Sequence, residues 1–240
     1  MKISTNELFG PTIQGEGKSA GREVLFLRLA RCSLACVWCD TPYTWNWTGT
    51  KFQHPEKFDP KKEIHELTEE EVVERLHQLS NTVKALVISG GEPLIQQQKL
   101  IGLLTVLKAD GWWIEVETNG TIVPLDSFVE LVDQFNCSPK LSNSGPDNRL
   151  KMRERPEALK KLASLSKTTF KFVIITDTDL EEVLGLVRRY NLQQVYLMPE
   201  GRTKEEQLER QEKVRLLCKN QGFKFSPRLH ILKWGARRAI

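Results

Sequence analysis

The sequence predicts an α/β fold, namely a partial, incomplete TIM-like barrel of about six parallel strands with helices outside. Two observations support this prediction. From Thr68 onward, apolar segments of strand length alternate with amphipathic segments of helix length, which favours a parallel sheet with right-handed crossovers. Short polar or glycine-rich motifs directly follow several of the strands, at the positions where such folds place their functional residues.

Segments rich in apolar, β-branched and aromatic residues are expected as strands. The core strands are expected at Val24–Leu29, Lys84–Ser89, Trp112–Glu117, a short segment that ends at Cys137, Thr169–Thr176 and Val195–Met198. Phe223–Ser226 is expected as an additional strand. Lys171 interrupts the apolar pattern of its strand, and we expect it to face inward or to lie at an edge, without an assigned role.

Helices are expected between these strands. Thr68–Glu71 has the capping pattern of a helix start, and the apolar residues that follow it share one helical face. Further helices are expected after Pro93 through Lys108 and at Leu125–Phe135, Pro156–Leu165, Leu180–Tyr190 and Lys204–Asn220. No repeat or linker divides the chain, so residues 1–240 are expected to form a single domain.

Three segments lie outside the regular alternation. Residues 7–17 contain three glycines and a proline, which exclude a regular helix, and they are expected as a turn or as a loop that contacts a ligand. Residues 42–66 are expected as an insertion that covers the site or forms a surface loop. The C-terminal tail is expected to close the site.

The composition limits the classes of partner. The 240 residues are 40% apolar and have a formal net charge of +4, which suits one ordinary globular domain. Without a run of lysines or arginines, this charge gives no support for a nucleic-acid surface. No apolar run approaches the length of a membrane span, and the N-terminus lacks the apolar core of a secretory signal. Five cysteines in such a chain indicate a reducing, cytoplasmic location.

Cys32, Cys36 and Cys39 fall within eight residues, with the spacing C-x3-C-x2-C, on the loop after the first predicted core strand. Three thiolates can bind three irons of a [4Fe-4S] cluster and leave the fourth iron open to a substrate or cofactor. A zinc site usually takes four ligands, and no second pair of ligands follows at a suitable spacing. A disulfide framework suits small secreted domains with an even cysteine count. The spacing therefore favours the cluster, with zinc as the main alternative.

The same spacing is the signature of the radical S-adenosylmethionine (SAM) superfamily, which this chain resembles. More narrowly, the chain resembles the family of 7-carboxy-7-deazaguanine synthases, which belong to the queuosine and 7-deazapurine pathway. The motifs that carry this resemblance span most of the chain and are Glu7–Gly17, Phe26–Leu29, Cys39–Thr41, Ser89–Pro93, Glu117–Gly120, Ser138–Lys140 and the tail around His230.

The resemblance implies a radical SAM lyase that contracts the ring of 6-carboxy-5,6,7,8-tetrahydropterin to 7-carboxy-7-deazaguanine and releases ammonia. It implies a [4Fe-4S] cluster on the three cysteines, SAM as the second cofactor, and Mg2+ at Thr41, bridging this hydroxyl and the substrate carboxylate. It also implies a reducing flavodoxin or similar electron donor, and a homodimer. A radical SAM activating enzyme that acts on a glycine of a partner protein is the alternative.

By resemblance, the pterin pocket is formed by Ile13, Gln14, Gly15, Glu16, Arg28, Ser89, Glu117 and His230. Glu117 is the candidate catalytic residue, because it ends a strand and would point into the mouth of the barrel. A buried arginine needs an anionic partner. For Arg28 this partner is either the substrate carboxylate, as the resemblance implies, or an internal salt bridge.

By resemblance, SAM is bound by Gly91, Ser138, Pro139, Lys140, Leu197, Met198, Pro199 and Glu200. Gly90 and Gly91 would expose backbone groups to the SAM methionine moiety, and a tight turn is the alternative explanation of the two glycines. Lys140 is expected to pair with the SAM carboxylate or a ribose hydroxyl. Asn119 is either a further ligand or a turn residue.

Overall fold

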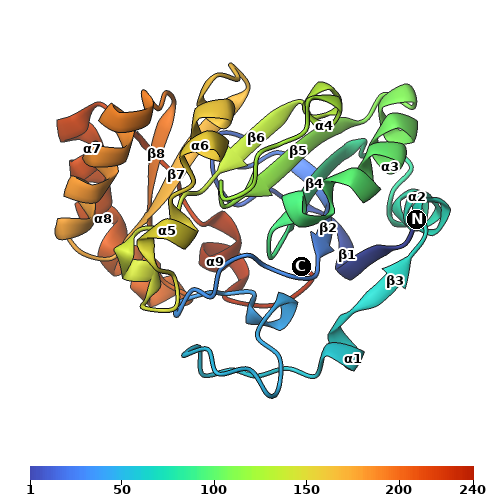
Figure 1. The fold of residues 1–240 in the computed structure, drawn as a ribbon, viewed down its shortest axis with the longest axis horizontal. Helices are drawn as coiled ribbons and strands as arrows, with labels where there is room; N and C mark the ends of the chain where they lie inside the picture. Colours follow the sequence, from blue (N-terminus) through green and yellow to red (C-terminus); the bar gives the residue numbers. More distant parts are fainter.

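A nine-stranded sheet, in the order β3-β1-β2-β4-β5-β6-β7-β8-β9, runs through the computed structural model, which describes residues 1–240 (Figure 1). The strands are β1 Ile3–Ile13, β2 Glu23–Leu29, β3 His65–Leu67, β4 Ala85–Gly90, β5 Trp113–Thr118, β6 Gln134–Cys137, β7 Thr168–Ile174, β8 Val195–Pro199 and β9 Lys224–Phe225. All neighbouring pairs from β2 to β9 are parallel. The predicted partial barrel of six core strands, with one short additional strand, is confirmed.

The helices are α1 Pro60–Glu63, α2 Glu69–Leu79, α3 Gln97–Ala109, α4 Asp126–Leu131, α5 Leu150–Arg153, α6 Pro156–Ala163, α7 Thr178–Tyr190, α8 Lys204–Gln221 and α9 Leu229–Trp234. Helices α2 to α4 and α6 to α8 follow one side of the sheet, whereas α9 and the segment between β2 and β3 lie on the other (Figure 1). Each of the six helices contributes buried apolar side chains to the main hydrophobic core. None of the helices combines the length and the apolar character that crossing a membrane requires.

The predicted start of α2 is confirmed in detail. The Thr68 hydroxyl accepts a hydrogen bond from the Glu71 backbone N–H at 3.2 Å, and the Glu71 carboxylate accepts one from the Thr68 N–H at 2.7 Å. These two bonds form a capping box, which satisfies donors that the first turn of a helix leaves free. The apolar face behind this cap packs into the core through Val72 and Leu76.

Two expectations were wrong. Residues 7–13 are not a turn or loop but part of β1, which pairs antiparallel with β2. The register of this pair shifts between Phe9 and Thr12, so the Gly10-Pro11 pair lies in a bulge, where a strand tolerates both residues. The helix expected over Leu125–Phe135 ends at Leu131, because Gln134–Cys137 instead pairs with β5 and β7 as strand β6.

Candidate active site

A cavity of about 220 Å³ lies where the parallel strands end, and it opens to solvent. Its wall is built from the N-terminal segment, β2, the cysteine loop, the ends of β4 to β8, and α9 with the tail. The carboxyl ends of parallel strands meet at one edge, which explains why motifs far apart in the sequence converge here. Arg237, Ala239 and Ile240 of the C-terminal tail are among the residues that line the cavity.

Most of the residues that the sequence singled out line this cavity. They are Ile13, Gln14, Gly15, Glu16, Arg28, Cys32, Cys36, Cys39, Thr41, Ser89, Gly91, Glu117, Ser138, Lys140, Met198, Glu200 and His230. Pro139, Leu197 and Pro199 do not line it. Leu197 is fully buried in the hydrophobic core on the opposite face of β8, so its side chain is not available to a ligand.

The three cysteine sulfurs each accept hydrogen bonds from nitrogen donors. Asn148 Nδ2 lies 3.3 Å from Cys36 Sγ, and Trp45 Nε1 lies 3.3 Å from Cys39 Sγ. Cys32 Sγ accepts from the Leu34 backbone N–H at 3.5 Å. Burial raises the pKa of all three thiols, that of Cys36 to about 12. A bound cation is therefore needed to hold the cysteines as thiolates.

The spacing of the sulfurs distinguishes the two metal centres that the sequence left open. Tetrahedral zinc with Zn–S bonds of about 2.3 Å would bring its sulfurs to about 3.8 Å from one another. The three cysteine sulfurs do not all lie within 4.8 Å of one another, whereas Glu16, Asp40 and His230 do bring their ligand atoms that close together. The three sulfurs as they stand are therefore too far apart for a single tetrahedral zinc ion, which favours the cluster.

Glycine at positions 90 and 91 is required by the packing of the chain against the start of the cysteine loop. A Cβ at Gly90, whose φ is +128°, would lie 2.2 Å from the Leu29 carbonyl oxygen. A Cβ at Gly91 would lie 2.1 Å from the Arg31 carbonyl oxygen. The Gly91 N–H donates to the Leu29 carbonyl at 3.1 Å. Close packing therefore explains both glycines, and it holds the cysteine loop against the end of β4.

Arg28 has an internal partner and also faces the cavity. Its Nε donates to the Glu7 carboxylate at 2.8 Å, which is the internal salt bridge that the sequence left open. Glu7 also accepts hydrogen bonds from Tyr43 and Arg238. Neither terminal nitrogen of Arg28 has a hydrogen-bond partner in the protein. The guanidinium is thus fixed from behind, with its two NH2 groups free to bind an anion.

Gln14 links two carboxylates of β5. Its amide nitrogen donates to Glu115 at 2.6 Å and to Glu117 at 3.1 Å. Ser89 donates to the other oxygen of Glu117 at 2.5 Å. Glu117 is half-buried and faces the cavity, whereas Glu115 lies fully buried behind it and accepts further hydrogen bonds from Ser19 and Asn136. Burial first, and then the adjacent Glu117 charge, raise the pKa of Glu115 to about 7.

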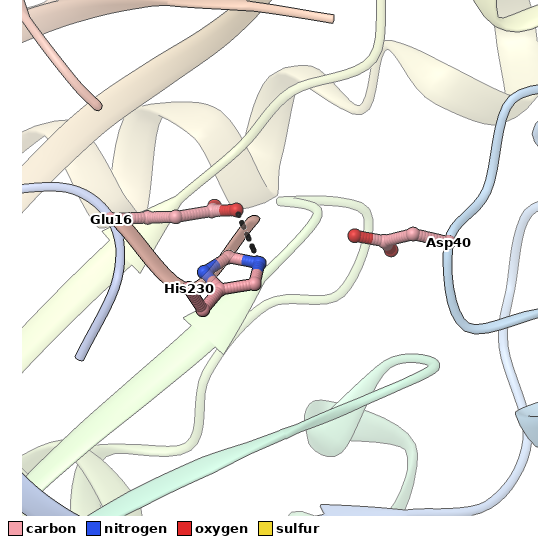
Figure 2. Close-up of side chains that lie close together, drawn as sticks. All are labelled: Glu16, Asp40 and His230. Carbon is pink, nitrogen blue, oxygen red and sulfur yellow. Dashed lines mark ion pairs between the residues drawn. The ribbon is translucent and has the colours of Figure 1, made fainter. Parts of the chain in front are cut away.

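Glu16 is the centre of a charged network at the cavity wall. It forms ion pairs with Lys171 and with Arg228, and Arg228 also pairs with Asp40. Figure 2 shows Glu16 beside His230, with Asp40 pointing toward them from the loop after the cysteines. Burial alone would raise the pKa of Glu16, but the charges of Lys171 and Arg228 outweigh it and hold that pKa well below 4.5.

This network does not fit a metal ion, although Glu16, Asp40 and His230 bring their ligand atoms within 4.8 Å of one another. The two carboxylates are already neutralised by Lys171 and Arg228, which are both buried. Burial lowers the pKa of His230, so the imidazole is neutral near pH 7. A divalent ion here would add two uncompensated positive charges to a buried site, which is strongly unfavourable.

Several residues of the site were not identified from the sequence. Lys171 interrupted an apolar strand, which was a usable signal, and the structure shows it facing inward with Glu16 as its partner. Arg228 lies two residues before His230, and no sequence pattern marks it as part of the site. Asn148 lies in a polar loop that contacts the cysteines only through the tertiary fold. The fully buried Glu115 shares a strand face with Glu117, and that periodicity was its only signal.

Comparisons with known proteins agree with this arrangement. The family described as "Radical SAM superfamily" matches residues 28–161. The chain is 36% identical to a 7-carboxy-7-deazaguanine synthase of Pyrobaculum aerophilum, over 99% of this chain and 97% of that protein. It is 30% identical to the enzyme of that name from Bacillus subtilis, over 99% and 98% of the two chains.

Among solved structures, the fold resembles that of QueE from Escherichia coli. The TM-score is 0.69 at 23% identity, and the match covers 94% of this chain and 93% of that one. At this identity the likeness supports the fold, and the full-length relatives support the family. The resemblance seen in the sequence motifs is thereby confirmed, and the chain belongs to the family of 7-carboxy-7-deazaguanine synthases within the radical SAM superfamily.

Proposed function

We propose that this protein converts 6-carboxy-5,6,7,8-tetrahydropterin to 7-carboxy-7-deazaguanine and ammonia, with a [4Fe-4S] cluster and SAM as cofactors. The observation that carries the proposal is the convergence, in one cavity, of the three cysteines with Gln14 and Glu117. The reaction is inferred from family membership, and the side chains that line the cavity are chemically suited to it. The cytoplasm is the proposed location, because reduced thiols are needed to hold the cluster.

Cys32, Cys36 and Cys39 would hold the cluster through three irons. When bound, the cluster and SAM supply reductive radical chemistry, which the side chains of the protein cannot supply themselves. The protein shields this centre, because Trp45 is almost fully buried and lies against Cys39. The pocket for SAM would be formed by Gly91, Ser138, Lys140, Met198 and Glu200, which all line the cavity.

Lys140 is poised for an anionic group of SAM. Its ammonium donates to Ser138 Oγ at 2.9 Å and to the Ser138 carbonyl at 3.0 Å, and no carboxylate pairs with it. Pro139, Leu197 and Pro199, which the sequence assigned to SAM, do not line the cavity, so no contact with SAM is proposed for them.

The substrate would be held by charge at one end and by hydrogen bonds at the other. The free NH2 groups of Arg28 suit the pterin carboxylate. Glu117 accepts hydrogen bonds, so it suits the N–H groups of the pterin ring, and Gln14 and Ser89 hold it in place. Glu117 is the group best placed to accept a proton from the reacting ring. Ile13, Gly15, Glu16 and the neutral His230 complete the wall and exclude water.

Mg2+ at Thr41 is a further part of the proposal. The Thr41 hydroxyl lines the cavity and is a hard oxygen ligand, of the kind Mg2+ takes together with waters and substrate oxygens. The only hydrogen bond of this hydroxyl within the protein is with the sulfur of Cys39, at 3.6 Å. A homodimer and a reducing flavodoxin or similar electron donor are proposed on family membership alone.

An anaerobic turnover assay tests the proposal. Reconstituted protein is mixed with SAM, a chemical reductant, Mg2+ and carboxytetrahydropterin, and the deazaguanine is followed by mass spectrometry. Product formation that is lost in Cys36→Ala, and retained in Cys218→Ala on the far helix α8, supports the assignment. A protein that binds iron and cleaves SAM without forming deazaguanine would favour the alternative, an activating enzyme with a protein substrate.

A further inference from the structure

Two nitrogen donors that no step of the proposed reaction uses point at the cysteine sulfurs. Trp45 Nε1 donates to Cys39 Sγ, and Asn148 Nδ2 donates to Cys36 Sγ, each at 3.3 Å. Asn119 Nδ2 lies farther from Cys32 Sγ, at 3.8 Å, and also donates to Ser33 Oγ at 3.0 Å. Asn148 lies 112 positions from its cysteine in the chain, so tertiary folding brings this donor to the cysteine loop.

The orientation of each close donor is fixed. The Asn148 carbonyl oxygen accepts the Ala35 backbone N–H at 2.8 Å, so its NH2 group must point the other way, toward Cys36. The Trp45 indole packs edge-on against Phe52 and His54. Both donor side chains are almost fully buried. Because both donors are buried and held in one orientation, their hydrogen bonds to sulfur are a fixed part of the structure of the site.

Hydrogen bonds to ligating sulfurs change the reduction potential of an iron–sulfur cluster. Ligated thiolates carry negative charge, and one-electron reduction increases that charge. An N–H donor stabilises the more negative, reduced form more strongly than the oxidised form. Donors aimed at two of the three sulfurs therefore make the cluster easier to reduce.

We propose that Trp45 and Asn148 are positioning residues that raise the reduction potential of the cluster through N–H···S hydrogen bonds to Cys39 and Cys36. The inference rests on the proposed function only in requiring that these cysteines hold the cluster. It assigns a role to two residues outside the cysteine motif, and it predicts a property that can be measured without turnover.

Trp45→Phe is the cleanest test, because it removes the N–H group and keeps an aromatic ring. Trp47→Phe is the matched control, because it lies in the same loop and its buried Nε1 has no hydrogen-bond partner. Asn148→Asp is the second variant, since it keeps an oxygen for the Ala35 N–H and loses the donor to sulfur. Iron content and absorbance near 400 nm establish loading, and anaerobic redox titration followed by electron paramagnetic resonance gives the midpoint potential.

We expect Trp45→Phe to make reduction about tenfold less favourable, a potential about 59 mV more negative for one electron. Asn148→Asp should shift the potential in the same direction, and Trp47→Phe should leave it unchanged. Loaded Trp45→Phe and Asn148→Asp proteins with the wild-type potential would overturn the inference. It would also be overturned if both variants failed to bind iron while Trp47→Phe bound it, because the donors would then act in assembly. Wild-type protein without iron would instead refute the proposed function.

Discussion

Replacing Glu16 by glutamine should destabilise the protein markedly, because it leaves buried positive charges without their partner. The exposed fraction is 7% for the side chains of Lys171 and Arg228 and 12% for that of Glu16. Breaking a buried ion pair by removing one partner costs about 3–5 kcal/mol. Arg228 keeps Asp40 as a partner, so the lower end, about 3 kcal/mol, is expected. For a chain of this size that corresponds to a fall in Tm of about 6–12 °C.

The assay is equilibrium unfolding in denaturant with a surface control. Glu56→Gln removes the carboxylate of a far more exposed pair with Arg202, so it should cost less than about 1 kcal/mol. A double variant, Glu16→Gln with Lys171→Met, removes the unpaired charge and should recover part of the loss. The reasoning is refuted if Glu16→Gln lies within about 1 kcal/mol of wild type, or if the double variant is no more stable than the single one.

The difference between wild type and Glu16→Gln should also depend on pH. The pKa of Glu16 is lower in the folded protein than its ordinary 4.5. A carboxylate of this kind contributes its stability above the unfolded pKa and loses it as the pH falls toward the folded pKa. The difference should therefore be largest near neutral pH and shrink below about pH 4.5, because protonated glutamate resembles glutamine.

Three further predictions concern other parts of the molecule. Glu115→Gln should remove a pH dependence of the stability. The pKa of Glu115 is about 7 in the folded protein against an ordinary 4.5, so the free energy of unfolding of the wild type should fall by up to about 3 kcal/mol as the pH rises through that interval. The free energy of unfolding of the variant should not fall in this way. Gly15→Ala should displace α9, because the new Cβ would lie 2.0 Å from His230 Nδ1; hydrogen exchange of residues 229–234 should become faster, and unchanged protection would contradict the steric argument. Thr68→Ala should lose the cap of α2, with a cost of about 1 kcal/mol and a fall in Tm of about 2–4 °C, and a thermal melt indistinguishable from wild type would contradict it.

Much of the fold was predictable because local sequence patterns determine the helices and strands. The alternation of apolar strands and amphipathic helices located all six core strands, and the Thr68 capping pattern located the start of α2. Strand β1 was missed, since Gly10 and Pro11 are strand breakers in isolation. The bulge that accommodates them exists only because β2 lies alongside. The end of α4 was misjudged for a related reason, because pairing with β5 and β7 overrides the apolar periodicity.

Residues of the site were predictable where reactive side chains cluster in a short segment or lie at the end of a strand. The three cysteines and Glu117 are of this kind, and the cavity unites them. Lys171 stood out as a charged residue in an apolar strand, but its partner Glu16 is 155 positions away in the chain. Asn148 and Arg228 are ordinary polar residues in sequence, and only tertiary contacts make them part of the site. Local sequence patterns cannot identify such contacts between distant residues.

The pairing of Arg228 with Glu16 has a consequence for how the protein assembles. These residues are 212 positions apart, so the segment around Glu16 is synthesised well before the segment around Arg228, and the wall of the cavity is complete only when both are present. Contacts between such distant segments close large loops, and they form late and slowly. During synthesis the N-terminal half can fold first, with the cysteine loop still open to its surroundings. Because α9 contributes to the wall of the cavity that the cysteines line, we expect the cysteines to be most accessible, for cluster insertion and for oxidative damage alike, before α9 docks.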